Sequence, residues 1–576
     1  MTDKVIVTNM TALRDKYTAQ GIKAIQAALN DLIAADKKRG LTTSVVALDD
    51  AKAMKKFGAT PVKNAANSRE NKKAIDGVYS ALAPDYLMIL GAIDVVPHQD
   101  IKNPLFTTDP EGDTEEFAFG DLPYACDAPF SRELKNFTGP TRVVGRLPDL
   151  TGQGDAKYLI GLLKTATTWK SSDKSEYQTY LGISCEKWQE STAESLNNMF
   201  SSSDDMQTSP TQGFKWKPKL INRKVHFVNC HGGDTFPDFL GQSSTHDEDM
   251  PTSHQAAFVG KKGNLVEGTV AAAECCFGGQ LYNPSEADAG QMGMCNTYLD
   301  KKAYGFFGST TTAYGPFSGN DQADLICQYF IQRVLAGASL GRAALEARQR
   351  FIEKASPLSP MNRKTLAQFN LYGDPSIVPV AAPTSTKVVA PKLTSLSVAA
   401  KSLGKAKGMV AAKAVQEASA VERSERRQTL RAKGALLSQL QPQMSRSESV
   451  PPKIQSSLKK IMAELHYKPL ISLSFKVQAA PAVPVLKKSA MAKGFAKAIG
   501  AKKQSTTAFH VMFGTLPNAA TTPMPKAPKK GTAKAKGFAA SAAKQPMKTT
   551  RIRKFVVLEA KEVDGKIVSV KEAHSK

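Results

Sequence analysis

Residues 1–382 alternate between two hydrophobic patterns. In one, apolar residues recur every three or four positions, as from Ile22 to Leu32 within residues 12–40, which predicts an amphipathic helix. In the other, a short continuous apolar run is closed by Gly or Pro, as in residues 85–97 (DYLMILGAIDVVP). Such a run is typical of a parallel strand buried on both faces.

Further segments repeat the two patterns along this part of the chain. Four more strands are expected around residues 142–148, 223–233, 268–279 and 303–316, and helices are expected at 321–337 and 339–355. Alternating strands and helices favour an α/β fold, a mostly parallel sheet flanked by helices on both faces. Two subdomains, at about 1–170 and 171–382, would share this fold.

The character of the chain changes beyond Pro383. Lys, Ala and Pro dominate residues 383–550, and few aromatic residues remain to build a core. Such composition predicts a largely disordered extension. Residues 551–576 differ, because apolar and polar positions alternate around Asp564-Gly565, and we expect a β-hairpin there.

The positive charge is confined to this extension. Residues 401–576 hold 35 Lys and Arg against 9 Asp and Glu, whereas residues 1–400 hold 42 against 43. Any electrostatic attraction to a polyanion therefore belongs to the extension alone, and weak binding of this kind is one partner that the sequence allows. No apolar run is long enough to cross a membrane, and the first residues lack a signal-peptide pattern, so we expect a cytoplasmic protein.

The seven cysteines do not form a recognisable scaffold. Their number is odd and their spacing fits no zinc site, so neither disulfides nor a metal or other cofactor is expected. Two strand ends carry reactive side chains instead: His231-Gly232-Gly233 after one apolar run and Glu274-Cys275-Cys276 after another. A thiol, an imidazole and glycine-flanked main chain are what nucleophilic catalysis on a peptide needs. Neighbouring strand residues face opposite ways, so only one cysteine can face a cleft, and the residues alone do not decide which.

Taken in order, these segments resemble the caspase-like (clan CD) cysteine peptidases, most closely the gingipain family. The pattern of an acidic residue, a Cys and a Gly around residues 274–279 resembles that family, as do GDLPY at 120–124, GFFGSTTTAYGP at 305–316 and NLYGDPSIVPV at 370–380. The resemblance implies a cysteine endopeptidase fold over residues 1–382. Cys230 before the histidine and the doubled cysteine depart from the family pattern.

The resemblance also implies roles for individual residues. Cys276 would be the nucleophile and His231 the general acid and base, with the main-chain N–H groups of Gly232 and Cys276 forming the oxyanion hole. Asp121 would line the primary specificity pocket, with Glu274 as a second candidate and Tyr314 in the pocket wall. A buried carboxylate there selects Arg or Lys before the cleaved bond.

Two other functions remain open at this point: a catalytically silent signalling scaffold that keeps the fold, and a polyanion- or nucleic-acid-binding protein acting through the basic extension. Retention of His231 and Cys276 with their glycines favours the enzyme. Self-processing, or activation by a partner or ligand, is common among caspase-like enzymes and is part of the expectation.

Overall fold

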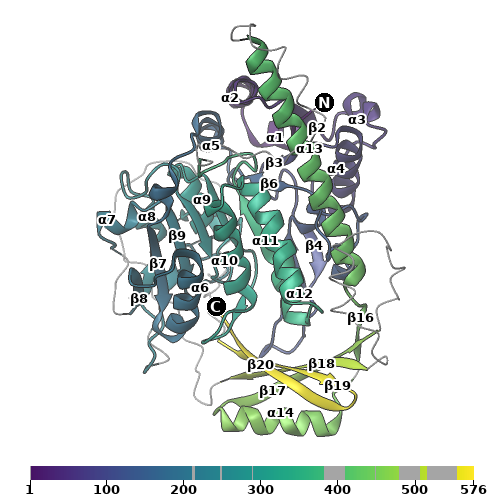
Figure 1. Ribbon diagram of the computed structural model, residues 1–576, viewed down its shortest axis with the longest axis vertical. Helices are drawn as coiled ribbons and strands as arrows, with labels where there is room; N and C mark the ends of the chain where they lie inside the picture. The colour runs from purple at the N-terminus through teal and green to yellow at the C-terminus, as the bar shows by residue number, and fades with distance from the viewer. Residues whose placement is uncertain are drawn as a thin grey trace, which may run out of the picture.

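The computed structural model describes residues 2–210, 215–246, 250–287, 290–381, 409–447, 449–478, 506–515 and 554–576 (Figure 1). Its centre is a ten-stranded sheet in the order β2-β1-β3-β6-β15-β13-β12-β9-β7-β8. The predicted α/β fold with a mostly parallel sheet is therefore confirmed. The strands are β1 (Lys4–Thr8), β2 (Thr43–Ala47), β3 (Tyr86–Leu90), β6 (Val144–Leu147), β7 (Tyr180–Cys185), β8 (Met206–Ser209), β9 (Val225–Asn229), β12 (Val270–Ala273), β13 (Gly305–Ser309) and β15 (Phe369–Tyr372).

The sheet consists of two parallel halves that run in opposite directions. β15 pairs in parallel with β6 and antiparallel with β13. The pairing of β15 with β13 is the only antiparallel one among these ten strands. β1, β2, β3 and β6 come from the first part of the chain, and β7, β8, β9, β12 and β13 come from the second. The carboxyl ends of the second group therefore lie at the opposite edge of the sheet from those of the first.

Helices cover both faces of the sheet, and two apolar layers fill the space between. Residues 12–40 form two helices rather than one, because Thr18 accepts a hydrogen bond from the N–H of Gly21 and so begins a new helix. The helices of this part are α1 (Met10–Lys16), α2 (Ala19–Lys38), α3 (Ala51–Lys56), α4 (Ser68–Leu82), α5 (Ala156–Thr168), α6 (Gln189–Phe200), α7 (Pro218–Ile221), α8 (Ala256–Val259), α9 (Met294–Asp300), α10 (Gln322–Leu335), α11 (Leu340–Lys354) and α12 (Pro360–Gln368).

Short strands outside the large sheet shape its edges. β4 (Gln99–Lys102) pairs with β5 (Phe117–Gly120), and β10 (Phe239–Leu240) pairs with β11 (Thr252–His254). A third short strand, β14 (Tyr314–Gly315), follows β13 and joins a separate six-stranded sheet. β14 thus connects the large sheet to the C-terminal part of the chain.

The expectation of disorder between residues 383 and 550 does not hold for the described part of that range. The six-stranded sheet has the order β14-β20-β19-β18-β17-β16, and one helix packs on it (Figure 1). Stretches in which apolar and polar residues alternate supply its apolar face. The average composition of the long basic segment hides this local pattern. The new elements are α13 (Met409–Leu440), β16 (Met444–Ser447), α14 (Pro452–Glu464), β17 (Lys468–Val477), β18 (Thr507–Thr515), β19 (Val556–Val563) and β20 (Lys566–Ser575).

The repeated AKGF motifs at residues 492–495 and 535–538 lie outside the described residues. Residues 551–576 contain a hairpin, in which β19 and β20 pair antiparallel and are joined at Asp564-Gly565.

Basic side chains of α13 form ion pairs with acidic residues that precede β1 and β3. Arg423 lies 2.6 Å from a carboxylate oxygen of Asp3 and 3.0 Å from one of Asp85, and Arg427 lies 2.8 Å from Asp85. These cations are therefore paired within the chain, and the formal charge of the extension overstates what α13 offers to an external polyanion. Within the described ranges, no helix is both long and apolar enough to span a bilayer.

Candidate functional site

The carboxyl ends of β9 and β12 bring His231 and Cys276 to one edge of the sheet. The two strands pair in parallel, with Val228 opposite Ala273, so the residues that follow them leave at the same edge. A methyl group on Gly232 would lie 1.8 Å from the main-chain oxygen of Cys276. The two segments thus touch, and only glycine at position 232 permits the approach.

The two adjacent cysteines face opposite sides of the sheet. Cys275 is fully buried, and its Sγ lies 3.8 Å from the main-chain oxygen of Val228, within the apolar layer on one face. Cys276 belongs to the layer on the other face, where the N–H of Ala313 lies 3.2 Å from its Sγ. Cys276 is therefore the cysteine whose thiol faces the loop that follows β13.

The imidazole of His231 is held from two sides. Its Nε2 lies 2.9 Å from Oε1 of Gln242, and the ring of Trp188 meets it edge-on at 4.6 Å between centroids. With Gln242 as acceptor, Nε2 carries the ring proton and Nδ1 keeps its lone pair. Nδ1 has no hydrogen-bond partner among the described residues, so it is the nitrogen available for proton transfer.

Burial keeps both reactive groups neutral in this structure. Desolvation lowers the pKa of His231 to about 3, an effect that the hydrogen bond to Gln242 only partly offsets. Desolvation likewise raises the pKa of Cys276 to about 12, although the N–H of Ala313 favours the thiolate. Cys276 and His231 are 4% and 2% exposed, so solvent hardly reaches either one.

The last residue of the sequence, Lys576, explains this burial. The main-chain N–H of Cys276 donates a hydrogen bond of 3.0 Å to the main-chain oxygen of Lys576. The Nζ of Lys576 contacts the carboxylate of Glu274 and lies 2.9 Å from Oδ1 of Asp324. Glu274, Asp324 and Lys576 have fully buried side chains, which meet just after the end of β12.

Glu274 and Asp324 form a close pair of carboxyl groups. Burial raises the pKa of Glu274 well above its ordinary value, and the neighbouring charge of Asp324 raises it further. Lys576 acts in the opposite direction, and the two carboxylates raise the pKa of its own ammonium group. The pair thus requires a cation between its members to stay ionised. We name Glu274, Asp324 and Gly315 the lysine pocket.

Gly315 is the third member because it leaves room for the lysine side chain. A methyl group at this position would lie 2.0 Å from Cε of Lys576 and 2.6 Å from Oδ2 of Asp324. No side chain other than hydrogen fits there while the pocket is occupied.

Asp121 has a partner within the protein. Its two carboxylate oxygens accept hydrogen bonds from Nε and Nη2 of Arg146, at 2.9 and 2.6 Å. Burial alone would raise the pKa of Asp121, but the guanidinium outweighs it and the pKa is lowered. Asp121 therefore neutralises Arg146 of β6, and the carboxylates that meet a lysine beside Cys276 are Glu274 and Asp324.

Tyr314 lies next to Gly315, with its main chain in β14 and its ring among the apolar residues of the six-stranded sheet. Its hydroxyl donates to Asp113 at 2.6 Å, and the fully buried ring packs in the apolar layer of the six-stranded sheet. Its backbone, as part of β14, pairs with β20.

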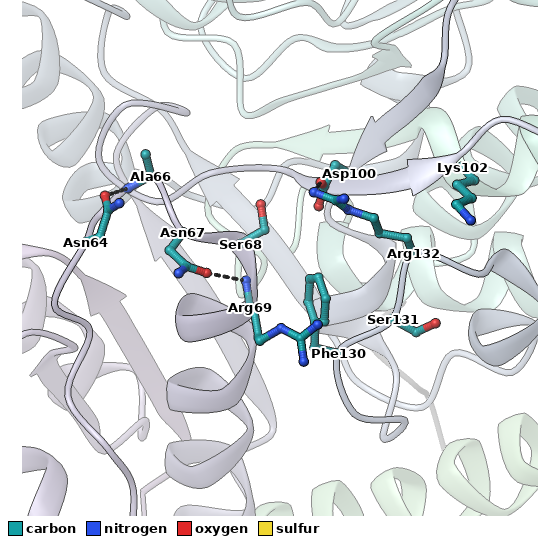
Figure 2. Close-up of a pocket in the computed structure, with 10 residues that line it drawn as sticks. All are labelled: Asn64, Ala66, Asn67, Ser68, Arg69, Asp100, Lys102, Phe130, Ser131 and Arg132. Atoms are coloured by element: carbon teal, nitrogen blue, oxygen red, sulfur yellow. Dashed lines mark hydrogen bonds and ion pairs between the residues drawn. The ribbon is translucent and has the colours of Figure 1, made fainter.

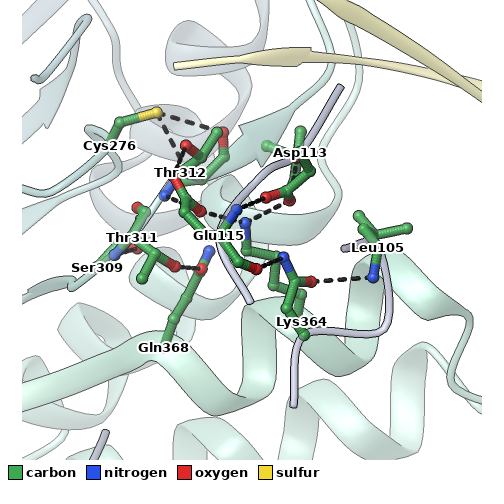
Figure 3. A network of polar contacts seen from close by, with 12 residues as sticks. Leu105, Asp113, Glu115, Cys276, Ser309, Thr311, Thr312, Lys364 and Gln368 are labelled. Carbon is green, nitrogen blue, oxygen red and sulfur yellow. Dashed lines mark hydrogen bonds and ion pairs between the residues drawn. The ribbon is translucent and has the colours of Figure 1, made fainter. Parts of the chain in front are cut away.

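A buried ionic network supports the loop beside the thiol (Figure 3). Lys364 of α12 lies 2.5 Å from Asp113 and 2.7 Å from Glu115. Glu115 in turn accepts hydrogen bonds from the main-chain N–H and the hydroxyl of Thr312. The next residue, Ala313, contacts Sγ of Cys276, so the network fixes the main chain that the thiol rests on.

A surface hollow of about 750 Å³ lies elsewhere, between the start of α4 and the β4 region (Figure 2). Asp100 and Arg132 pair at 2.5 Å on its wall, and Asn67 caps α4 there. None of the candidate site residues lines it. Nowhere in the described ranges do three or more His, Cys, Asp or Glu side chains gather as a metal site.

Sequence reasoning did not identify Asp324, Gly315, Gln242, Trp188 or Lys576. Asp324 could have been noticed as an acidic residue inside the apolar pattern of residues 321–337. Nothing in the sequence marks Lys576, because a lysine that ends a polar strand is ordinarily exposed. Its place depends on the pairing of β14 with β20, which is a long-range contact.

Most of this chain is similar to a known protein family. The model of peptidase family C25 matches residues 3–380. A solved structure described only as a protease is similar at 13% identity, with a TM-score of 0.41, over 66% of this chain and 78% of that one. The Saccharomyces cerevisiae separase–securin complex is similar at 11% identity, with a TM-score of 0.25, over 42% of this chain and 14% of that one. No curated protein matches the sequence.

Proposed function

We propose that this chain, which belongs to peptidase family C25 and is therefore a cysteine peptidase, is an endopeptidase. Its nucleophile is Cys276, and its general acid and base is His231. One observation carries this proposal: the main-chain N–H of Cys276 donates a hydrogen bond of 3.0 Å to a main-chain oxygen, that of Lys576. An N–H group of the nucleophile that already holds such an oxygen is suited to stabilise the oxyanion of a scissile carbonyl.

The reaction follows from the groups present. Nδ1 of His231 takes the proton of the Cys276 thiol, and the thiolate attacks the carbonyl carbon of the scissile bond. The N–H of Cys276 stabilises the oxyanion, together with that of Gly232. The bond to nitrogen breaks, the amine leaves with the proton from His231, and a thioester remains. Water then attacks the thioester while His231 accepts its proton, which releases the carboxylic acid and restores the thiol.

We further propose that the residue before the cleaved bond is basic. The carboxylates of Glu274 and Asp324 are buried beside Cys276, and a buried anionic pair favours a cationic side chain strongly. Asp121 stays a weaker candidate, since Arg146 already occupies both of its oxygens.

The test compares wild type with Cys276→Ala, Cys275→Ala and His231→Ala on short fluorogenic peptides ending in Lys, Arg, Asp or Leu. We expect cleavage after basic residues by wild type and Cys275→Ala, and a loss of at least about 1000-fold in Cys276→Ala and His231→Ala. Activity that survives in Cys276→Ala would overturn the proposed nucleophile. Cleavage only after Asp or Leu would overturn the basic specificity and leave the nucleophile in place.

Self-processing belongs to the same proposal. The chain carries many Lys and Arg residues between positions 479 and 553, and an enzyme that cuts after basic residues would accept them. Intact mass measured over time in wild type and Cys276→Ala distinguishes self-cleavage from cleavage by a contaminant. If wild type cleaves neither itself nor any peptide, and the variant Lys576→Glu cleaves no peptide either, the silent scaffold becomes the better description.

A further inference from the structure

We propose that the C-terminal segment of the chain, residues 573–576, occupies the substrate-binding site of its own catalytic domain. The side chain of Lys576 lies in the lysine pocket, in the position of the substrate residue that precedes the cleaved bond. This inference rests on the proposed function, which it extends by assigning the pocket to Glu274, Asp324 and Gly315 and its occupant to Lys576. The segment thereby holds the enzyme closed.

The backbone of the segment binds as an added strand. β20 pairs antiparallel with β14, Ser575 lying opposite Tyr314 and His574 opposite Gly315, and the N–H of Lys576 donates to the oxygen of Ala313 at 3.0 Å. Peptides commonly bind receptors and enzymes by adding a strand to an edge in this way. Main-chain pairing needs no particular sequence, so it would accept substrates as readily as the segment itself.

The carbonyl of Lys576 lies where a scissile carbonyl must lie. Its oxygen accepts the N–H of Cys276, the same residue that supplies the thiol. Together with the hydrogen bond from the N–H of Lys576 to Ala313, this contact holds the main chain of residue 576 between the two segments that carry Cys276 and Ala313.

The side chain of Lys576 is buried in the lysine pocket. The Nζ bridges Glu274 and Asp324 and lies 5.6 Å from the ring of Trp188, and the whole residue is 1% exposed. An ammonium group is a compact charge that can contact two carboxylates at once, whereas guanidinium is larger and planar. Because Gly315 already borders Cε closely, the pocket should prefer Lys to Arg.

The side chains of β20 pass from exposed to buried at the point where the strand enters the site. Residues 568–571 of β20 are exposed, whereas 573–576 are buried. His574 stacks on Phe317 with 3.4 Å between ring centroids, and Lys571 contacts Asp321 just outside the site. The site therefore contacts several side chains of the segment as well as its terminal lysine.

Electrostatics make the closed state depend on Lys576. Without this cation, one of the two carboxyl groups, Glu274 or Asp324, would have to take up a proton, because a buried pair of like charges is costly. A substrate lysine can replace it, because it brings the same charge and the same main-chain hydrogen bonds. Opening therefore exchanges one lysine for another, and the segment is a competitive occupant.

The experiment measures how fast iodoacetamide alkylates Cys276 in the full chain, with the modified residue located by peptide mass mapping. Lys576→Glu places a third carboxylate against Glu274 and Asp324 and should expel the segment. We expect alkylation of Cys276 to become about tenfold faster or more. The control is Lys566→Glu, which makes the same charge change at an exposed position on the same strand and should stay within about twofold of wild type.

The remaining cysteines report on folding, because all of them are buried. If Lys576→Glu exposes them as well, the variant has unfolded, and the milder Lys576→Ala replaces it. In that variant, a free peptide with the sequence of residues 570–576 should slow alkylation of Cys276, and the same peptide ending in Glu should not. Equal alkylation rates in wild type and Lys576→Ala, or equal effects of the two peptides, would overturn the proposal.

The outcome also separates this inference from the proposed function. Faster alkylation in Lys576→Glu without cleavage of any peptide would support the closed state and contradict the peptidase activity. Cleavage of lysine peptides by wild type at the full rate of Lys576→Glu, with equal alkylation, would support the peptidase and contradict the closure.

Discussion

Asp324 differs from Glu274 in how it reaches the site. Glu274 follows β12 directly, whereas Asp324 lies in the first turn of α10 and comes to the pocket only through the packing of α10 on the sheet. Its Oδ1 also accepts a bond of 3.3 Å from Asn229, at the end of β9. One carboxylate thus contacts both the strand that precedes His231 and the proposed lysine ligand.

We expect Asp324→Asn to weaken cleavage after Lys. The amide keeps the shape and one oxygen but removes a charge that contacts the ammonium group, so kcat/KM for lysine peptides should fall about 100-fold, mostly through KM. Steady-state kinetics on the lysine peptide test this. An Asp121→Asn variant that loses lysine preference while Asp324→Asn keeps it would contradict the assignment of the pocket.

Gly315→Ala tests the space in the pocket. A methyl group 2.0 Å from the position of Cε cannot coexist with a bound lysine, so the variant should lose cleavage of lysine peptides. Gly161→Ala is the matched control, because a methyl group there meets nothing within 4 Å on an exposed turn of α5. Equal activity of the two variants would show that the side chain before the cleaved bond lies elsewhere.

At the scale of elements, α12 connects the two sheets with the site. Its Lys364 neutralises Asp113 and Glu115, and Glu115 holds the Thr312 segment beside the thiol. Removing one member of a buried ionic cluster leaves the others unpaired. The segment 309–315 therefore depends on a helix that follows it by some fifty residues in the sequence.

We predict that Lys364→Met destabilises the protein by about 3 kcal/mol or more, because two buried carboxylates lose their cation. Chemical denaturation followed by fluorescence measures the change. Lys102→Met breaks an ion pair in which both side chains are at least half exposed, and should cost less than about 1 kcal/mol. Similar losses in the two variants would contradict the importance of the buried network.

β19 contributes a pH dependence through Glu559, whose carboxylate is buried and accepts the N–H of Met361 in α12. Burial raises its pKa from 4.5 to about 7. Below about pH 4.5 the group is protonated in both the folded and the unfolded chain; above this, the unfolded chain ionises first. Its contribution to stability is therefore present at low pH and is lost as pH rises toward 7.

We expect Glu559→Gln to remove this loss. The decrease in the free energy of unfolding from pH 5 to pH 7.5 should therefore be smaller in the variant than in wild type, by up to about 3 kcal/mol. Urea unfolding at the two pH values measures the difference. Glu464→Gln, at an exposed position on α14, should leave the wild-type slope unchanged. A steeper fall in Glu559→Gln would contradict the sign.

The elements show which features local pattern could predict. β3, β6, β9, β12 and β13, with α10 and α11, all form where apolar runs and helical periodicity placed them, because buried strands and amphipathic helices are specified locally. The reversal of direction at β15 was not predicted, since strand order depends on contacts distant in sequence. Of the second sheet only the β19–β20 hairpin was predicted; β17 and β18, of ten and nine residues, were missed because they lie within a basic, alanine-rich context.

On the scale of the whole molecule, the same distinction applies to the site. His231, Gly232, Glu274 and Cys276 follow strands directly, so their motif could be read from the chain. Asp324 and Lys576 come from distant elements and meet only in the folded protein. The proposed pocket therefore shares Glu274 with the one that the resemblance implied and adds Asp324, which only the fold brings there.

The difference in charge between residues 1–400 and residues 401–576 is partly neutralised by ion pairs between them. Some of the excess cations in residues 401–576 pair with acids of the first 400, as Arg423 does with Asp3 and Asp85, and Lys576 with Glu274 and Asp324. The basic segment thus docks on a nearly neutral domain through particular acidic residues. Its formal charge alone says little about external partners.

One measurement tests the central claim, that Cys276 is the nucleophile for cleavage after lysine. The Lys576→Glu variant is incubated with a peptidyl acyloxymethyl ketone that ends in lysine, and the modified residue is located by mass spectrometry. We predict that the thiolate of Cys276 displaces the carboxylate leaving group, giving one thioether at this residue, and that a matched reagent ending in glutamate reacts far more slowly. Modification of Cys275 or of another residue, or equal reaction with both reagents, would contradict the account.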